Sequence, residues 1–172
     1  RDSGAGAHLN RMSEYSERMA ELLGWSEERC SALALAAPLH DVGKIGIADV
    51  ILNKAGTLTA QEFNRLKSHT TLGAEILSVS NSPVMRLGAK IAHYHHENYD
   101  GTGYPCGLVG SQIPIEAMIV SIVDVYDALR TSRPYKEALD HAAAIDIMCN
   151  GDERTDISKF HPGLLKTFLQ HH

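Results

Sequence analysis

Apolar positions recur along this chain at the intervals of helices. The first stripe repeats every three, four or seven residues and comprises Leu9, Met12, Met19, Leu22 and Leu23. Gly24 follows this stripe and is a suitable helix stop, because glycine readily adopts the left-handed conformation found after helix ends. Ser26 is a suitable cap for a second helix, and Pro38 is expected to bend or restart that helix just before His40.

The middle of the chain contains two further helix starts. Thr59 and Glu62 match a capping box, so a helix is expected to begin here and to carry His69. A Ser-Pro pair at positions 82–83 begins another helix, because proline fits the first turn, where its missing N–H is not needed. This helix is expected to end at the histidine pair 95–96.

The most apolar helix of the chain is expected to start at Pro114. Its predicted core face comprises Ile115, Met118, Ile119, Ile122 and Val123. Asp124 falls in the middle of this helix, where a carboxylate costs free energy unless it is paired or binds a metal. Asp140 is expected to cap another helix that stops near Gly151, and Pro162 is expected to begin a last short one.

Together these elements predict an all-α fold, a single-domain helical bundle of about six to eight helices. No segment shows the strict alternation that is typical of a half-buried strand. The 172 residues are enough for one domain with a sizeable core. Residues 98–114 are rich in glycine, which is typical of an ordered loop rather than of a second domain.

Composition narrows the classes of function. The net charge of -5 argues against broad binding to DNA or RNA, which requires a basic surface. No apolar run has the length of a membrane span. The three cysteines form no Cys-x-x-Cys pair, so neither a disulfide framework nor a zinc ribbon is indicated, and a reducing cytoplasm is expected.

Two pairs of potential metal ligands stand out, a His-Asp pair at positions 40–41 and a His-His pair at positions 95–96. Ten histidines are many for this length, although positions 171–172 are consistent with the remnant of a purification tag. Divalent first-row metals accept neutral imidazole and carboxylate together, and Asp41 is the natural bridge between two ions. A paired metal centre with open positions can activate water for attack on a phosphate.

The sequence resembles the HD-GYP family, a branch of the HD phosphohydrolase superfamily, from His8 to about Phe168. The blocks that carry the resemblance are His-Asp-Val-Gly-Lys-Ile-Gly at 40–46, Lys-Ser-His at 67–69, His-His-Glu at 95–97, Asp-Gly-Thr-Gly-Tyr-Pro at 100–105, Ile-Pro at 113–114, Asp-Val-Tyr-Asp-Ala-Leu at 124–129 and Arg-Pro-Tyr-Lys at 133–136. A single His-Asp pair would be weak evidence, whereas so many ordered blocks at family spacing are strong evidence.

The resemblance implies an HD-type bundle over residues 1–172 and a phosphodiesterase that hydrolyses cyclic di-GMP to pGpG or onward to GMP. The implied metal ligands are His8, His40, Asp41, His69, His95, His96 and Asp124. Family geometry would place His8, His40, Asp41 and Asp124 on one ion, and Asp41, His69, His95 and His96 on the other. The nucleophile would be a water or hydroxide between the ions.

Two divalent ions are expected rather than three. Some members of the family add a Glu one helical turn before the first histidine and bind a third ion, but this chain has Gly4 at that position, which supplies no ligand. Iron or manganese suits the mixed set of imidazoles and carboxylates best, and nickel, cobalt or zinc also fits.

The resemblance also implies substrate contacts around the metal ligands. The matching positions are Lys44, Gly103, Tyr104, Pro105, Arg133 and Lys136. Lys44 is expected to contact the scissile phosphate and to stabilise developing charge, which makes it catalytic together with Asp41. Glu97 and Asp127 are interpreted as partners that orient ligating imidazoles, with a solvated or capping carboxylate as the alternative.

Two other functions remain open beside the hydrolysis of cyclic di-GMP. The chain could sense cyclic di-GMP, or dock a GGDEF-domain protein through the Gly-Tyr-Pro loop, with weak catalysis. It could also hydrolyse another cyclic dinucleotide. Degenerate members usually lose ligands, and this chain retains them, which favours the enzyme. Family habit further predicts a bacterial signalling protein with a regulatory domain before this segment, and a homodimer.

Overall fold

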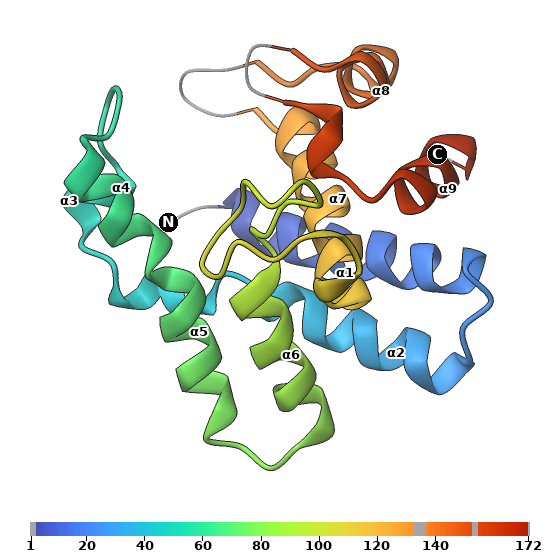
Figure 1. Cartoon of the computed structure of the whole chain (residues 1–172), viewed down its shortest axis with the longest axis horizontal. Coiled ribbons are helices and arrows are strands. Elements are labelled where there is room, and N and C mark those ends of the chain that lie inside the picture. The colour runs from blue at the N-terminus through green and yellow to red at the C-terminus, as the bar shows by residue number, and fades with distance from the viewer. Residues whose placement is uncertain (1–2, 133–136, 153–154, 172) are drawn as a thin grey trace.

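The computed structural model describes residues 3–132, 137–152 and 155–171 of the chain. In chain order its α-helices are α1 (Ser3–Leu22), α2 (Glu27–Ala36), α3 (Asp49–Leu52), α4 (Ala60–Lys67), α5 (His69–Ser78), α6 (Pro83–Tyr94), α7 (Ile115–Arg130), α8 (His141–Asn150) and α9 (Pro162–His171), as drawn in Figure 1. Short 3₁₀ helices occupy η1 (Ala37–Leu39), η2 (Val42–Gly46), η3 (Gly110–Gln112) and η4 (Ile157–Lys159). These ranges contain no strand, so the prediction of an all-α fold is confirmed. None of their helices is both long and apolar enough to cross a membrane.

The core centres on α7, which packs against α1, α6, α8 and α9. Most of its predicted core face is buried, whereas Ile115, at the start of the helix, is only partly buried. The largest apolar side chains that are fully buried come from six helices and include Met12, Met19, Leu33, Ile91, Ile119, Ile122, Met148 and Phe168. Burying such side chains is the main favourable term in folding.

One position of the predicted stripe on α1 is wrong. Leu9 is 41% exposed, because the buried face of the helix follows Met12, Ser16 and Met19, and Leu9 falls at its edge near the N-terminal end. The predicted stop after this helix is confirmed, since Gly24 adopts a φ of +72°, which favours glycine.

Side-chain caps begin the helices where the sequence predicts them. The Ser26 hydroxyl accepts a hydrogen bond from the Arg29 N–H at 3.4 Å. Thr59 and Glu62 form the predicted capping box at the start of α4. The predicted helix break before His40 is also found. α2 ends at Ala36, and the 3₁₀ helix η1, which contains Pro38, follows it directly.

The helix that begins at the capping box was predicted to continue to His69. This prediction is wrong, because α4 ends at Lys67 and His69 begins α5. The Ser68 N–H bonds to the Arg65 carbonyl three residues back at 3.2 Å, which tightens the turn and ends α4. His69 therefore lies at the first turn of a new helix rather than inside a long one.

Glycines allow η2, α5 and α6 to approach closely. A Cβ atom on Gly43 of η2 would lie 1.9 Å from the backbone oxygen of His69, and one on Gly73 of α5 would lie 3.2 Å from the Ala92 Cβ. Figure 1 shows α5 and α6 side by side below the centre of the molecule, and they pack against each other. This packing brings the first turn of α5 and the end of α6 next to the His40-Asp41 segment.

Candidate metal centre

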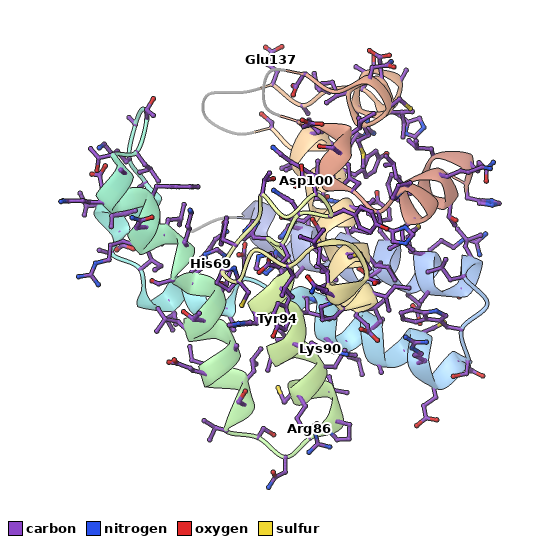
Figure 2. The ribbon with its side chains drawn as sticks, viewed as in Figure 1. His69, Arg86, Lys90, Tyr94, Asp100 and Glu137 are labelled. Atoms are coloured by element: carbon purple, nitrogen blue, oxygen red, sulfur yellow. The ribbon has the colours of Figure 1, made fainter. Side chains whose placement is uncertain are left out.

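The predicted metal ligands converge on one region from five separate parts of the chain. His8 comes from α1, His40 and Asp41 from the junction of η1 and η2, and Asp124 from the middle of α7. His69 begins α5, and the histidine pair 95–96 follows α6. Figure 2 labels His69 and Tyr94 at the neighbouring ends of α5 and α6 that face the centre of the molecule.

These side chains form two groups whose potential ligand atoms lie within 4.8 Å of one another. One group consists of Asp41, His69, His95 and His96, and the other consists of His8, His40 and Asp124. The division matches the one that the resemblance implies, except that Asp41 is grouped with the first set alone.

Asp41 nevertheless lies between the two groups. Its Oδ2 atom is 3.4 Å from His40 Nε2, and its Oδ1 atom is 3.4 Å from His69 Nε2 and 3.8 Å from His95 Nε2. The His40 Nε2 atom is also 3.9 Å from Asp124 Oδ1. One carboxylate thus faces imidazoles of both groups, which is the arrangement a bridging ligand requires.

Three of the imidazoles are oriented in the same way, by a hydrogen bond to a nearby backbone carbonyl. The Nδ1 atoms of His40, His69 and His95 lie 2.9, 2.6 and 2.9 Å from backbone carbonyls three residues earlier in the chain. A carbonyl can only accept, so each Nδ1 carries the proton and donates. In its neutral form each ring then keeps a lone pair on Nε2, which is the atom that faces Asp41.

Among the described residues, two buried polar atoms of the predicted ligands have no hydrogen-bond partner. They are His40 Nε2 and Asp41 Oδ1, one from each group. Leaving a buried acceptor unsatisfied costs about 1–3 kcal/mol. A divalent cation coordinates a neutral imidazole nitrogen and a carboxylate oxygen, and it would satisfy both atoms. The donor set and the two unpartnered atoms therefore fit a metal ion.

The protonation states also fit a metal. Burial lowers the pKa values of His69, His95 and His96, the last to about 3, because water no longer solvates the imidazolium. Burial would raise the pKa of Asp41, but His40 and Lys44 outweigh it and hold that pKa well below its usual range. At neutral pH the group therefore contains an ionised carboxylate beside neutral imidazoles, the forms that bind metals.

His40 differs from the other buried imidazoles. Burial lowers its pKa, but the nearby carboxylates of Asp41 and Asp124 outweigh this effect and the net pKa is raised. The sign agrees with the position of its ring against two carboxylates, which attract a positive charge.

His8 is oriented across the molecule rather than locally. Its Nδ1 atom lies 2.7 Å from Asp127 Oδ2, and the same buried carboxylate pairs with the Arg11 guanidinium. Burial raises the pKa of Asp127, but the bonds to His8 and Arg11 outweigh it and hold the pKa at about 2. The contact confirms the expectation that Asp127 bonds to one of the predicted ligand imidazoles. It uses the Nδ1 atom of His8, and no hydrogen bond to Nε2 is found within the described part of the chain.

Glu97 contradicts the same expectation. Its carboxylate accepts hydrogen bonds from the backbone N–H groups of Cys106 at 2.6 Å and Leu108 at 2.8 Å, and no contact with a predicted ligand imidazole is found among the described residues. The side chain is 3% exposed. Glu97 therefore fixes the 98–109 loop beside the site instead of orienting a ligand.

The Gly-Tyr-Pro segment covers one side of the ligand group. The Tyr104 N–H donates to the His96 carbonyl at 3.0 Å, and the Tyr104 ring stacks on the His96 ring at 4.8 Å between centroids. A Cβ atom on Gly103 would lie 2.2 Å from the Asn98 nitrogen, so glycine is needed for this close approach. The bond between Tyr104 and Pro105 is cis, and Pro105 is exposed.

The remaining predicted substrate contacts are placed in part. Lys44 forms an ion pair with Asp41, and its side chain is 42% exposed, so it lies at the edge of the ligand group. Arg133 and Lys136 lie outside the described residues. Sequence reasoning gave no role to Phe63, or to Lys67 of the Lys-Ser-His block, whose side chains contact the ring of Tyr104. An aromatic residue on an amphipathic helix is usually part of a core, so the sequence offers no signal for Phe63.

Comparison with known proteins agrees with this geometry. The family model described as HD domain matches residues 1–158. The chain belongs to the HD domain family. The HD-GYP resemblance predicted from the motifs is likewise confirmed by the similarity of this HD domain to curated phosphodiesterases.

The chain is similar to two curated relatives in sequence and to one solved structure in fold. The HD domain is 52% identical over 145 residues to the cyclic di-GMP phosphodiesterase response regulator RpfG of Xanthomonas campestris, covering 84% of this chain and 38% of that protein. It is 40% identical over 172 residues to the 3'3'-cGAMP-specific phosphodiesterase 2 of Vibrio cholerae, covering 99% of this chain and 32% of that protein. The fold is similar to that of Bd1817 from Bdellovibrio bacteriovorus, with a TM-score of 0.71, 23% identity, and coverage of 95% of this chain and 50% of that one. The chain thus spans less than two fifths of the length of these curated relatives.

Proposed function

We propose that this HD domain is a metal-dependent phosphodiesterase that hydrolyses cyclic di-GMP to pGpG or onward to GMP. The observation that carries the proposal is the position of Asp41. Its carboxylate faces imidazoles of both ligand groups, and one of its oxygens is buried with no hydrogen-bond partner among the residues that the structure describes. The similarity to a relative named as a cyclic di-GMP phosphodiesterase supports the choice of substrate.

Two divalent ions are proposed, one for each ligand group, with Asp41 shared between them. Iron or manganese is the first choice for these nitrogen and oxygen donors, followed by nickel, cobalt or zinc. Ions held there would activate water for attack on phosphorus and offset the charge that develops on the phosphate. Gly4 lies one helical turn before His8 in α1, so a third ion would lack the Glu ligand used by some relatives.

The protein side chains around the ions would bind and orient the substrate. The Lys44 ammonium lies at the edge of the ligand group, where it can bind the scissile phosphate and stabilise its developing charge. Tyr104 covers His96 and limits the access of water from that side. Arg133 and Lys136 are proposed as further contacts to the ligand, as the family motif implies.

A second candidate substrate is another cyclic dinucleotide. The similarity over 99% of this chain to a 3'3'-cGAMP-specific phosphodiesterase favours this candidate as the alternative. A third candidate is a module that senses cyclic di-GMP or docks a GGDEF-domain protein. For docking, the 98–109 loop offers an exposed apolar side chain, Val109, which is 54% exposed.

The setting of the domain is proposed from the family as well. We propose a cytoplasmic bacterial signalling protein in which a regulatory domain precedes residues 1–172, and in which two copies form a homodimer.

The first experiment measures the metal content by elemental analysis together with the turnover of cyclic di-GMP by chromatography. About two metal ions per chain and turnover are expected for the wild type, and both should fall sharply in Asp41→Ala. Asp146→Ala is the matched control, because Asp146 is an exposed carboxylate on α8 that accepts a hydrogen bond from the side chain of Asn150. Tight binding of cyclic di-GMP without turnover under any metal would replace the enzyme by the binding module.

A further inference from the structure

Beside the proposed metal ligands, two side chains of α4, Phe63 and Lys67, contact Tyr104 of the 98–109 loop, and the proposed chemistry gives neither of these two a role. The ring of Phe63 contacts the ring of Tyr104 edge to face, at 6.2 Å between centroids. The Lys67 ammonium lies 4.8 Å from the centroid of the Phe63 ring and 5.3 Å from that of the Tyr104 ring. These three side chains are called the α4 lip below.

Ring contacts connect the α4 lip to the proposed metal ligands. Tyr104 stacks on His96, one of those ligands, and Phe63 contacts the same tyrosine ring edge to face. A group bound against Phe63 would therefore be separated from the metal ligand His96 by the ring of Tyr104. In a nucleotide, the base is separated from its phosphate by one sugar, so a base can reach the lip when the phosphate lies at the ligand group.

Packing of the protein core does not account for Phe63. Its side chain is 42% exposed, and no side chain of α4 is buried. The helix is nevertheless held firmly at its start, because Thr59 and Glu62 form a capping box and the Lys54 ammonium bonds to Glu62 at 2.6 Å. The fold thus fixes the position of an aromatic ring while leaving much of that ring open to solvent.

We propose that the α4 lip binds a purine base of the substrate by stacking on the exposed part of Phe63, with Lys67 adding positive charge for the anionic ligand. The inference rests on the proposed function and assigns a base-binding subsite to it. Aromatic side chains stack on every base with similar strength, because every base has a π-face. The lip therefore contributes affinity for guanine and adenine alike and does not discriminate between cyclic di-GMP and 3'3'-cGAMP.

The first test separates substrate binding from chemistry in Phe63→Leu, which removes the aromatic ring and keeps an apolar side chain. Loss of one stacked base is expected to raise KM by about tenfold or more, with kcat little changed. The rise should be similar for both dinucleotides, and Phe63→Trp should restore KM. Ile76→Ala is the matched control, because Ile76 on α5 is 45% exposed and lies outside the lip.

The outcomes keep this inference apart from the proposed function. A KM for Phe63→Leu equal to that of Ile76→Ala, in a protein that hydrolyses cyclic di-GMP, would overturn the base subsite and leave the phosphodiesterase intact. A wild type that hydrolyses neither dinucleotide would overturn the proposed function itself. A loss of kcat with unchanged KM would also overturn the subsite, because it would mean that Phe63 only supports the site structurally.

A second test detects stacking directly. The chain has a single tryptophan, Trp25, so the double variant Trp25→Phe/Phe63→Trp would carry its only tryptophan in the lip. Mixing this variant with cyclic di-GMP in a stopped-flow fluorimeter should quench the tryptophan emission before turnover, because a stacked guanine quenches indole. Unchanged emission at concentrations of cyclic di-GMP that saturate turnover would overturn the proposal.

Discussion

Gly43→Ala tests whether the close approach of η2 and α5 sets the geometry of the proposed metal centre. Gly43 lies two residues after Asp41, and its Cα faces the first turn of α5, which carries His69. An added Cβ would lie 1.9 Å from the His69 oxygen and 2.5 Å from the Gly73 nitrogen. Both neighbours are backbone atoms, so no side-chain rotation can relieve the clash.

The size of the effect follows from these distances. Real Cβ contacts below 3.0 Å are essentially absent, so η2 and α5 must separate by about 1 Å. This separation would widen the gap between Asp41 Oδ1 and His69 Nε2, which are now 3.4 Å apart. Overpacking of this kind costs about 1–3 kcal/mol of stability. A misplacement of about 1 Å at reacting groups can lower the rate by about 100-fold.

The assay combines thermal unfolding, metal content and turnover of cyclic di-GMP. Gly43→Ala should remain folded with a lower Tm, bind less metal and lose most of its turnover. Gly6→Ala is the control, because Gly6 is helical and a Cβ there meets nothing within 4 Å. The control should be unchanged or more stable by about 0.5–1 kcal/mol. Equal behaviour of the two variants in all three measurements would refute the reasoning.

Three further predictions concern single side chains around the site. Glu97→Gln should lower the stability by about 1–3 kcal/mol and raise KM, because its carboxylate accepts two N–H groups of the 98–109 loop; thermal unfolding and kinetics measure this. Asp127→Asn should weaken metal affinity about 10–100-fold, since it loosens His8; titration with the metal measures this. Burial holds the pKa of His96 at about 3, so the unfolded chain binds more protons below about pH 6.5, and the free energy of unfolding of the metal-free protein should fall as the pH drops from there towards 3. Urea unfolding at several pH values should show a shallower fall for His96→Gln.

The two carboxylate predictions have matched control variants, and His96→Gln is compared with the wild type. Glu75→Gln on α5 and Asp146→Asn on α8 change exposed carboxylates in the same way and should leave stability, kinetics and metal affinity unchanged. A Glu97→Gln protein as stable as Glu75→Gln would show that the loop does not depend on this carboxylate. Full metal affinity in Asp127→Asn would show that His8 needs no partner. A pH profile of His96→Gln parallel to that of the wild type would contradict the assigned pKa.

The sequence predicted those features that depend on neighbouring residues. The capping box of Thr59 and the stop at Gly24 are local, and the structure reproduces both. The convergence of the predicted ligand residues could be predicted as well, because several motifs at family spacing pointed to it together. The continuation of α4 to His69 was wrong, since a turn bonded three residues back looks the same in sequence as one bonded four residues back.

Features that depend on distant residues could not be predicted. Whether Glu97 would meet an imidazole or a backbone N–H depends on how the 98–109 loop folds back over it. The exposure of Phe63 depends on the neighbours of α4, and a hydrophobic pattern alone assigns an aromatic ring to the core. Asp127 was expected to orient a ligating imidazole, but the sequence did not show which one, because its partner His8 lies 119 residues away.

Because the imidazoles are oriented in two different ways, the two proposed ions should differ in how readily they are lost. His69 and His95 take their orientation from backbone carbonyls three residues earlier, near the ends of α4 and α6, and those bonds persist as long as these helix ends do. His8 depends on Asp127 across the fold, and any loosening between α1 and α7 releases it. A chelator should therefore empty the centre in order, first the site that includes His8 and then the site that includes His69. The stepwise loss would give a half-loaded protein whose properties can be measured in their own right.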